Sequence, residues 1–142
     1  MKNSKEILEN MLKTTQMGQS GIRSVMDISM RPALRQALES QLKEYDAIEQ
    51  EAQKIMSQRN WPITAADPVV RSLSSFVSRA KLTYGNTDSK IASMMIQGNT
   101  KGMISGLQDM HQFPQQDTAV STLAQKLIDT ETNNIRQMKT FL

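Results

Sequence analysis

The sequence predicts an all-α fold: a bundle of four long helices with a long helical crossover between the second and the third. Three observations support this prediction. Helix-forming residues dominate the composition, and alternating runs of β-branched residues are absent. Proline occurs at only four positions, and together with the glycines these prolines break the chain into segments. Within each long segment, apolar residues recur at helical spacing, which indicates one buried stripe per helix.

The first two long helices are predicted at 4–27 and 32–58. Ser4 stands just before Glu6 and is the expected N-cap of the first helix. Pro32 suits the first turn of the second helix, where its missing N–H costs no hydrogen bond. The two apolar stripes contain Leu8, Met11, Ile22 and Met26, and then Leu34, Leu38, Leu42, Ile48 and Ile55.

The other two long helices are predicted at 88–112 and 117–141. Residues that favour N-caps stand at both starts, namely Thr87 or Asp88 and Asp117 or Thr118. The third long helix offers two adjoining apolar faces. One contains Ile91, Met95, Gly98 and Gly102, and the other contains Ile96, Met103, Leu107 and Met110.

The connections constrain how the helices pack. The links from the first to the second helix and from the third to the fourth are short, so each pair is expected to form an antiparallel hairpin. About 28 residues separate Gln58 from Thr87, enough to travel the length of a bundle, and a shorter crossover helix is predicted there at 68–84. A plain up-down bundle does not need such a link. We therefore expect a single domain, 1–142, with one crossover.

Polar residues interrupt the apolar stripe in the middle of every long helix. In the last helix, Glu131 and Asn134 stand between Leu and Ile residues that recur at helical spacing. Burying an unpaired carboxylate costs several kcal/mol, so Glu131 needs a partner, a raised pKa or an opening to water. The predicted polar core layer consists of Gln19, Tyr45, Asn99, Glu131 and Asn134.

This layout resembles the ferritin-like superfamily, whose members place a di-metal site at the height of the polar layer. In that family each half of the bundle supplies a Glu and a Glu-x-x-His from successive helices. Here "ETNN" puts Glu131 and Asn134 at the matching i, i+3 spacing, with Asn in place of His. In the second helix, "EYDAIE" offers Glu44 and Glu49 but no histidine. The resemblance implies a ferritin-like bundle with a degenerate di-metal site.

Part of the chain is also similar to the spore coat protein F-type branch of clostridial and bacillar ferritin-like proteins. The similar stretches are "EYDAIEQEAQKIMSQRNWP" and, after the crossover, "SMMIQGNTKGMI". "QRNW" at 58–61 stands where members of that branch end the second helix. The resemblance implies a small, non-secreted bacterial protein that is associated with spores, and it assigns no chemistry.

The candidate metal ligands are Glu131, Glu49 and Glu44, with iron or manganese as the ions. A di-metal carboxylate site needs about four carboxylates and two imidazoles to offset the charge of two ions. Gln19 and Asn99 stand where two more Glu residues are needed, and the single histidine lies at the far end of its helix. We therefore expect no catalytic residue and no cofactor, and a polar layer that fixes helix register.

The composition argues against several other classes of protein. The chain has no cysteine, which rules out disulfides, thiolate metal sites and a cysteine nucleophile. A net charge of +3, with scattered basic residues and few aromatic ones, does not indicate a nucleic-acid surface. No apolar run is long enough for a membrane span, and the N-terminus lacks the apolar core of a signal peptide. We expect a cytoplasmic protein.

Two functions stay open at this point. The favoured one is a non-enzymatic structural or protein-interaction protein that binds other proteins or itself, with a homodimer as the favoured oligomer. The alternative is a metal-binding ferritin-like protein that uses an incomplete carboxylate site.

Overall fold

A computed structural model of the chain describes residues 2–63, 85–113 and 117–142, and this part of the chain contains four helices and no strand. The helices are α1 (Ser4–Val25), α2 (Pro32–Gln58), α4 (Thr87–His111) and α5 (Thr118–Lys139). The all-α prediction is confirmed, and the helix ends lie within two residues of the predicted ones. The shorter crossover helix expected at 68–84 lies outside the described residues.

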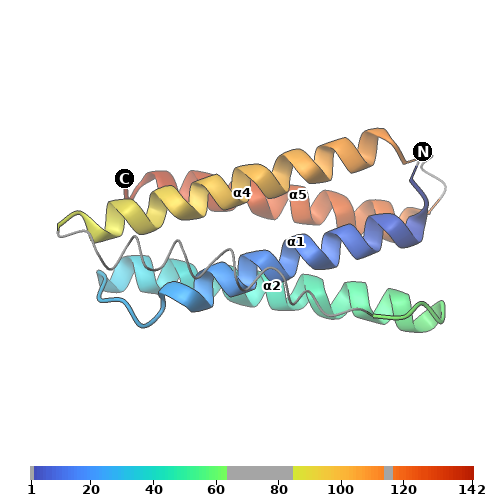
Figure 1. Cartoon of the computed structure of the whole chain (residues 1–142), viewed down its shortest axis with the longest axis horizontal. Helices are drawn as coiled ribbons and strands as arrows, with labels where there is room; N and C mark the ends of the chain where they lie inside the picture. The colour runs from blue at the N-terminus through green and yellow to red at the C-terminus, as the bar shows by residue number, and fades with distance from the viewer. Residues whose placement is uncertain (1, 64–84, 114–116) are drawn as a thin grey trace.

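The helices form two antiparallel hairpins, α1 with α2 and α4 with α5 (Figure 1). Helix α2 ends at the opposite end of the bundle from where α4 begins, so these two helices run parallel (Figure 1). Helix α1 packs against both α2 and α4, and α5 packs against both α4 and α2. This is the topology with one crossover that the loop lengths predict.

Local chemistry explains where the helices begin. Asn3, not Ser4, caps α1, because its side chain accepts a hydrogen bond from the backbone N–H of Glu6 at 2.9 Å. Ser4 is the first residue inside the helix. Pro32 opens α2 as predicted, and Asp117 caps α5 by accepting from the N–H of Val120. The N-cap of α4 is Asn86, and not Thr87 or Asp88 as predicted; its left-handed backbone (φ 53°) is one that Asn tolerates better than most residues.

The predicted stripes meet along the axis of the bundle and form one hydrophobic core. Helix α4 differs from the other three because it buries fewer of its apolar residues. Burial of the stripes removes apolar surface from water, which is the main force that holds the hairpins together. Fully buried members of the core include Ile7, Leu8, Leu34, Leu38, Ile48, Met56, Ile91 and Met138.

Two arginine–aspartate pairs join the ends of α2 to the second hairpin. At its start, Arg31 Nε donates to Asp88 Oδ2 at 2.6 Å. At its end, the guanidinium of Arg59 forms a bidentate pair with Asp117 and lies over the ring of Trp61, 5.2 Å from the ring centroid. These contacts fix the height of α2 relative to α4 and α5, and so help to align the polar groups at the centre. The described helices include none that is both long and apolar enough to cross a membrane.

Candidate functional site

The predicted polar layer is buried at the centre of the bundle. All five of its members are less than a tenth exposed, and all four described helices contribute at least one. Four of them are connected by hydrogen bonds through one atom, the hydroxyl oxygen of Tyr45. These four are Tyr45 of α2, Asn99 of α4, and Glu131 and Asn134 of α5.

The contacts of the Tyr45 hydroxyl are short. Its oxygen lies 2.8 Å from Asn99 Oδ1 and 2.8 Å from Glu131 Oε2. The side-chain amide of Asn134 donates to the same oxygen at 3.4 Å. The hydroxyl therefore joins α2, α4 and α5 at one point.

A count of hydrogens limits how these groups can be protonated. The phenol has one hydrogen, so it donates to only one of the two oxygens that lie at 2.8 Å. A protonated Glu131 supplies the second hydrogen: the acid donates to Tyr45, and Tyr45 donates to Asn99. The alternative is a rotated Asn99 amide that donates its N–H, which lets Tyr45 donate to an ionised Glu131. The geometry thus couples the charge of Glu131 to the orientation of Asn99.

Burial favours the neutral acid. Glu131 is only 2% exposed, and desolvation raises the pKa of its carboxyl from 4.5 to about 8, although the hydrogen bond with Tyr45 opposes part of this rise. Burial, with the neighbouring Glu131, also raises the pKa of Tyr45 well above its ordinary value. None of the salt bridges within the described ranges includes Glu131. At pH 7 the carboxyl is therefore mainly protonated.

Two glycines inside helices make room for the Tyr45–Glu131 pair. A Cβ atom on Gly18 of α1 would lie 2.6 to 3.0 Å from three atoms of the Tyr45 ring. A Cβ atom on Gly102 of α4 would lie 2.8 Å from Glu131 Oε1 and 3.0 Å from Thr14 Cγ2. The distances under 3.0 Å, to the Tyr45 ring and to Glu131 Oε1, are shorter than real Cβ contacts, so a side chain at either position would have to displace the pair. This role of the glycines is not visible in the sequence pattern.

Gln19, the fifth member of the layer, belongs to a different network. Its Nε2 donates to Asp46 Oδ1 at 2.9 Å and to Glu49 Oε1 at 3.3 Å. Gln16 donates to the other oxygen of Glu49. Glu49 is half-buried between α1 and α2 and makes no hydrogen bond to Glu131 within the described part of the chain.

The three candidate metal ligands do not come together. Glu44 is exposed and faces a groove, Glu49 binds the amides of Gln16 and Gln19, and Glu131 binds Tyr45. Among the described residues, no group of three or more His, Asp or Glu side chains could hold a metal ion. The carboxyl of Glu131 shares a hydrogen bond with the phenol of Tyr45, and the two amides of the network contact that phenol. This donor set does not fit a di-metal centre, which needs several ionised carboxylates.

A groove of about 1130 Å³ between α2 and α5 was not predicted from the sequence. Partial desolvation by the walls of this groove raises the pKa of the largely exposed Glu44, and the positive charge of Lys126 opposes the rise. Ser121 also lines the groove, and its buried hydroxyl oxygen has no hydrogen-bond partner among the residues that the structure describes. The rest of the wall mixes acidic, basic, hydroxyl and amide side chains with two apolar ones, Ala47 and Met110, which indicates no particular ligand.

Comparison with known proteins supports the fold. No family model matches the chain, and a search of curated proteins finds no match. Among solved structures, the crystal structure of a DUF305 fragment from Deinococcus radiodurans is similar, with a TM-score of 0.76 and 13% sequence identity over 96% of this chain and 93% of that chain. At this identity the likeness shows the fold alone. The comparison therefore supports the bundle of four helices, and it gives no support to the narrower likeness to the spore coat F-type branch.

The need for glycine at positions 18 and 102 can be tested by adding a single methyl group at each. Alanine in place of Gly18 or Gly102 improves helix propensity by about 1 kcal/mol, but it collides with the Tyr45–Glu131 pair. We expect Gly18→Ala and Gly102→Ala to lower the free energy of unfolding by about 1–2 kcal/mol, since overpacking a core costs roughly 1–3 kcal/mol. Urea denaturation at pH 7 measures the change.

Gly98 is the matched control on α4. A Cβ atom there would meet no described residue within 4 Å, so Gly98→Ala should raise the free energy of unfolding by about 0.5–1 kcal/mol. If Gly18→Ala and Gly102→Ala stabilise the protein as much as Gly98→Ala does, then the space at Gly18 and Gly102 does not constrain the core.

The raised pKa of Glu131 also predicts how stability depends on pH. The carboxyl ionises near pH 4.5 in the unfolded chain but near pH 8 in the folded one, so folding takes up a proton between these values. Its contribution to stability is fully present below about pH 4.5 and falls as pH rises, by up to about 1.4 kcal/mol per pH unit, until about pH 8.

Glu131→Gln isolates this contribution because the amide keeps hydrogen bonding and does not titrate. We expect the difference in unfolding free energy between variant and wild type to grow in favour of the variant from pH 5 to pH 8. Denaturation at several pH values measures this difference. A difference that stays constant over this range would show that Glu131 keeps an ordinary pKa in the folded protein.

Proposed function

We propose that the protein is a non-enzymatic, ferritin-like structural or protein-interaction protein with a degenerate di-metal site. The observation that supports this most is the closed hydrogen bonding of the layer around Tyr45. The hydroxyl of Tyr45 forms hydrogen bonds with Glu131, Asn99 and Asn134. Among the described residues, the one buried side-chain polar atom without a hydrogen-bond partner belongs to Ser121, which lies outside the layer. A layer of this kind aligns the helices at one height.

The register role has a physical basis. Sliding α2 by one turn along its neighbours would move the Tyr45 hydroxyl about 5.4 Å and leave several buried polar groups without partners. Each such loss costs roughly 1–3 kcal/mol, whereas a purely apolar stripe would tolerate the shift better. The polar layer thus contributes uniqueness of packing as well as stability.

A metal-binding ferritin-like protein with an incomplete carboxylate site is the second candidate, and iron or manganese would be the ion. The Glu131–Asn134 spacing in a ferritin-like fold favours it. The chemistry of the layer opposes it, because within the described part of the chain Glu131 is not joined by two further acidic or imidazole ligands, and amide and phenol groups are weak ligands for a transition metal.

Metal content separates the two candidates. The protein is purified after growth with added iron and manganese, and elemental analysis compares the wild type with Glu131→Gln. We expect substoichiometric metal in both proteins, at the same level. Stoichiometric iron or manganese in the wild type that is lost in Glu131→Gln would overturn the structural proposal in favour of metal binding.

Two narrower features belong to the same proposal. We infer from the resemblance of "EYDAIEQEAQKIMSQRNWP" to the spore coat F-type branch that the protein resides in the cytoplasm and associates with spores. We expect immunoblots to detect it in purified spores. Its presence in vegetative cells alone would remove the spore association and leave the structural role intact.

A further inference from the structure

The bundle is built from two units, the α1–α2 hairpin and the α4–α5 hairpin (Figure 1). The chain passes from the first to the second only once, in the stretch between Gln58 and Thr87. The contacts inside a hairpin do not depend on which copy of the chain supplies the other hairpin. The contact between the two hairpins therefore decides how the units combine.

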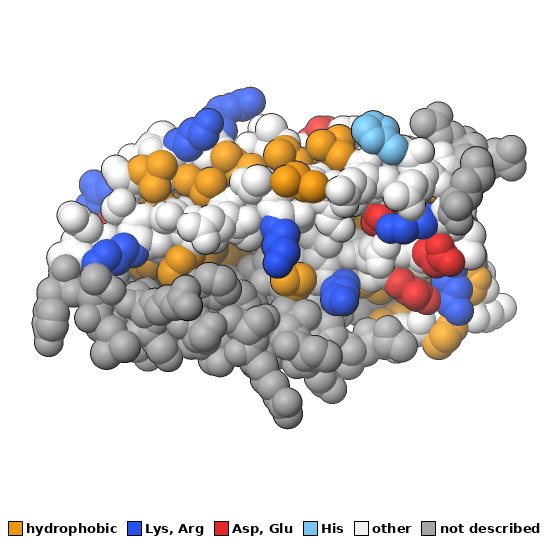
Figure 2. All heavy atoms as spheres, turned by 45° about the horizontal axis from the view of Figure 1, so that its top comes forward, with side chains coloured by type: hydrophobic (Ala, Val, Ile, Leu, Met, Phe, Trp, Pro, Cys, Tyr) orange, Lys and Arg blue, Asp and Glu red, His pale blue; other side chains and the backbone are white. Residues whose placement is uncertain are grey.

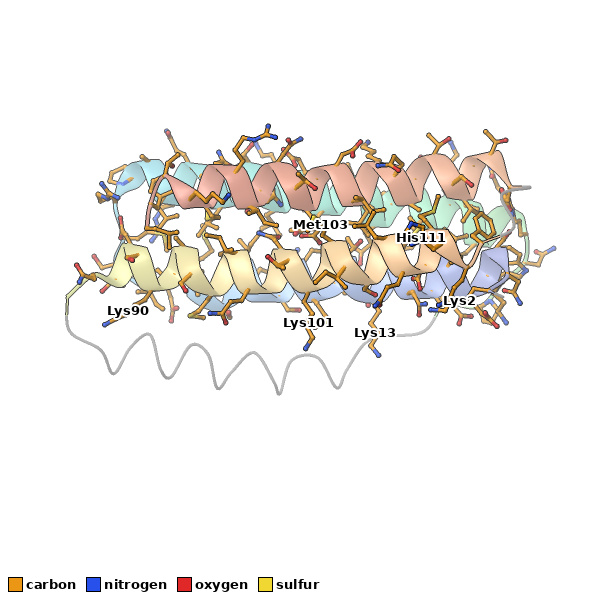
Figure 3. All side chains as sticks on the ribbon, turned by 90° about the horizontal axis from the view of Figure 1, so that it is seen from above. Lys2, Lys13, Lys90, Lys101, Met103 and His111 are labelled. Carbon is orange, nitrogen blue, oxygen red and sulfur yellow. The ribbon has the colours of Figure 1, made fainter. Side chains whose placement is uncertain are left out.

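Three salt bridges between described residues join the two hairpins, with the same polarity in each. They are Lys2 with Asp109, Arg31 with Asp88, and Arg59 with Asp117. In each of them the first hairpin supplies the cation and the second supplies the carboxylate. Charged side chains of both signs gather at the end of the bundle near His111 (Figure 2), and Lys2 lies at this end (Figure 3). At these positions a hairpin repels a second copy of itself and attracts the other hairpin.

Buried hydrogen bonds make the contact between the hairpins more selective. The hydroxyl of Tyr45 contacts polar side chains of α4 and α5. Gln41, which is only 2% exposed, donates to Gln137 at 2.8 Å. A partner without matching groups would leave these buried atoms without hydrogen bonds, which is costly. The surface that fits the inner face of α1–α2 is therefore the inner face of an α4–α5 hairpin.

We propose that two copies of this chain form a dimer by exchanging hairpins, so that α1–α2 of one copy packs against α4–α5 of the other. This inference rests on the proposed interaction role and names its partner. A second copy is the partner because it carries the hairpin that matches these charges and hydrogen bonds. The dimer has two complete bundles with the same contacts between hairpins as the monomer, which makes exchange a low-cost route to a dimer.

The connection between the hairpins is long enough for exchange. About 28 residues separate Gln58 from Thr87. A chain of this length reaches at most about 90 Å when it is extended. Helix α2, with 27 residues, is only about 40 Å long. The two hairpins of one chain can therefore belong to two neighbouring bundles.

Concentration decides between the two arrangements, because only the exchanged one needs a second chain. A covalent link holds two modules together at an effective concentration on the order of 1 mM. Well below this concentration, each α1–α2 hairpin pairs with the α4–α5 hairpin of its own chain. Near this concentration the hairpins of other chains compete, so we expect a mixture of monomer and exchanged dimer.

Refolding from urea at two concentrations tests whether the dimer forms. Wild type refolded at about 10 μM should give monomers, and wild type refolded at about 1 mM should also give dimers. Size-exclusion chromatography with light scattering, run soon after dilution, measures the masses. Exchange requires the core to open, so the dimer should persist after dilution long enough to be measured. Monomers alone at both concentrations overturn the proposal.

Mixed charge-reversal variants test whether the dimer forms by exchange. Arg31→Glu and Asp88→Arg each place like charges at one contact between the hairpins of their own chain. An exchanged dimer with one copy of each variant has opposite charges at this contact in both bundles. The other contacts of the two substituted residues are the same in both arrangements, so their changes cancel. Refolded together at about 1 mM, the two variants should give at least about three times the dimer that either gives alone.

Arg23 and Asp46 provide the matched control, because their salt bridge lies inside the α1–α2 hairpin. Exchange of hairpins cannot bring together two reversed charges of this pair that are on different chains. Arg23→Glu and Asp46→Arg refolded together should therefore give no more dimer than either gives alone. Circular dichroism checks that all four variants fold.

The outcomes separate this inference from the proposed function. A mixture of Arg31→Glu and Asp88→Arg that gives no extra dimer, or an equal gain for the control pair, overturns the exchange of hairpins. The wild-type experiment needs no variant, so it decides the proposal even where a variant fails to fold. None of these results bears on the metal content, which decides the proposed function independently.

Discussion

One buried oxygen atom, the hydroxyl of Tyr45, constrains the centre of this bundle. It lies within 2.8 Å of oxygens on two other helices, and it has a single hydrogen to donate. The protonation of Glu131, the orientation of Asn99 and the close approach of α1 and α4 at Gly18 and Gly102 follow from that contact. An aromatic ring and a carboxyl both need space, and the flanking helices provide it by having no side chain at these two positions.

The sequence predicts the helices well because their signals are local. Proline at the start of α2 and an aspartate before α5 mark helix ends through the backbone chemistry of the first turn. The first cap was misplaced by one residue, since Asn3 and Ser4 are both good caps and only the backbone decides between them. The topology follows from loop lengths, because a short loop permits only an antiparallel neighbour.

The site is only partly predictable. Interruptions in the apolar stripes identify the five polar residues, because a helical stripe must be buried whatever residues it contains. Which of them touch depends on the rotation of each helix about its own axis, which no sequence pattern specifies. Gln19 therefore reaches Asp46 and Glu49, not Tyr45, and Glu44 faces a groove outside the layer. The role of Gly18 and Gly102 cannot be predicted from the sequence for the same reason, because the side chain that needs the space is on another helix.

The arginine–aspartate pairs at the two ends of α2 give the bundle a second kind of sensitivity. The side chain of Arg31 is 64% exposed and that of Arg59 is 32% exposed, so dissolved ions reach both pairs, whereas the neutral network around Tyr45 is shielded from them. At physiological ionic strength the screening length is about 8 Å, and added salt weakens exposed pairs first. Between pH 5 and pH 8, ionic strength therefore acts on the ends of the bundle and pH acts on its middle, so fraying of the helix ends and loosening of the core can be controlled separately in this range; only stronger acid reaches the Arg59–Asp117 pair, because Arg59 lowers the pKa of Asp117 to about 2.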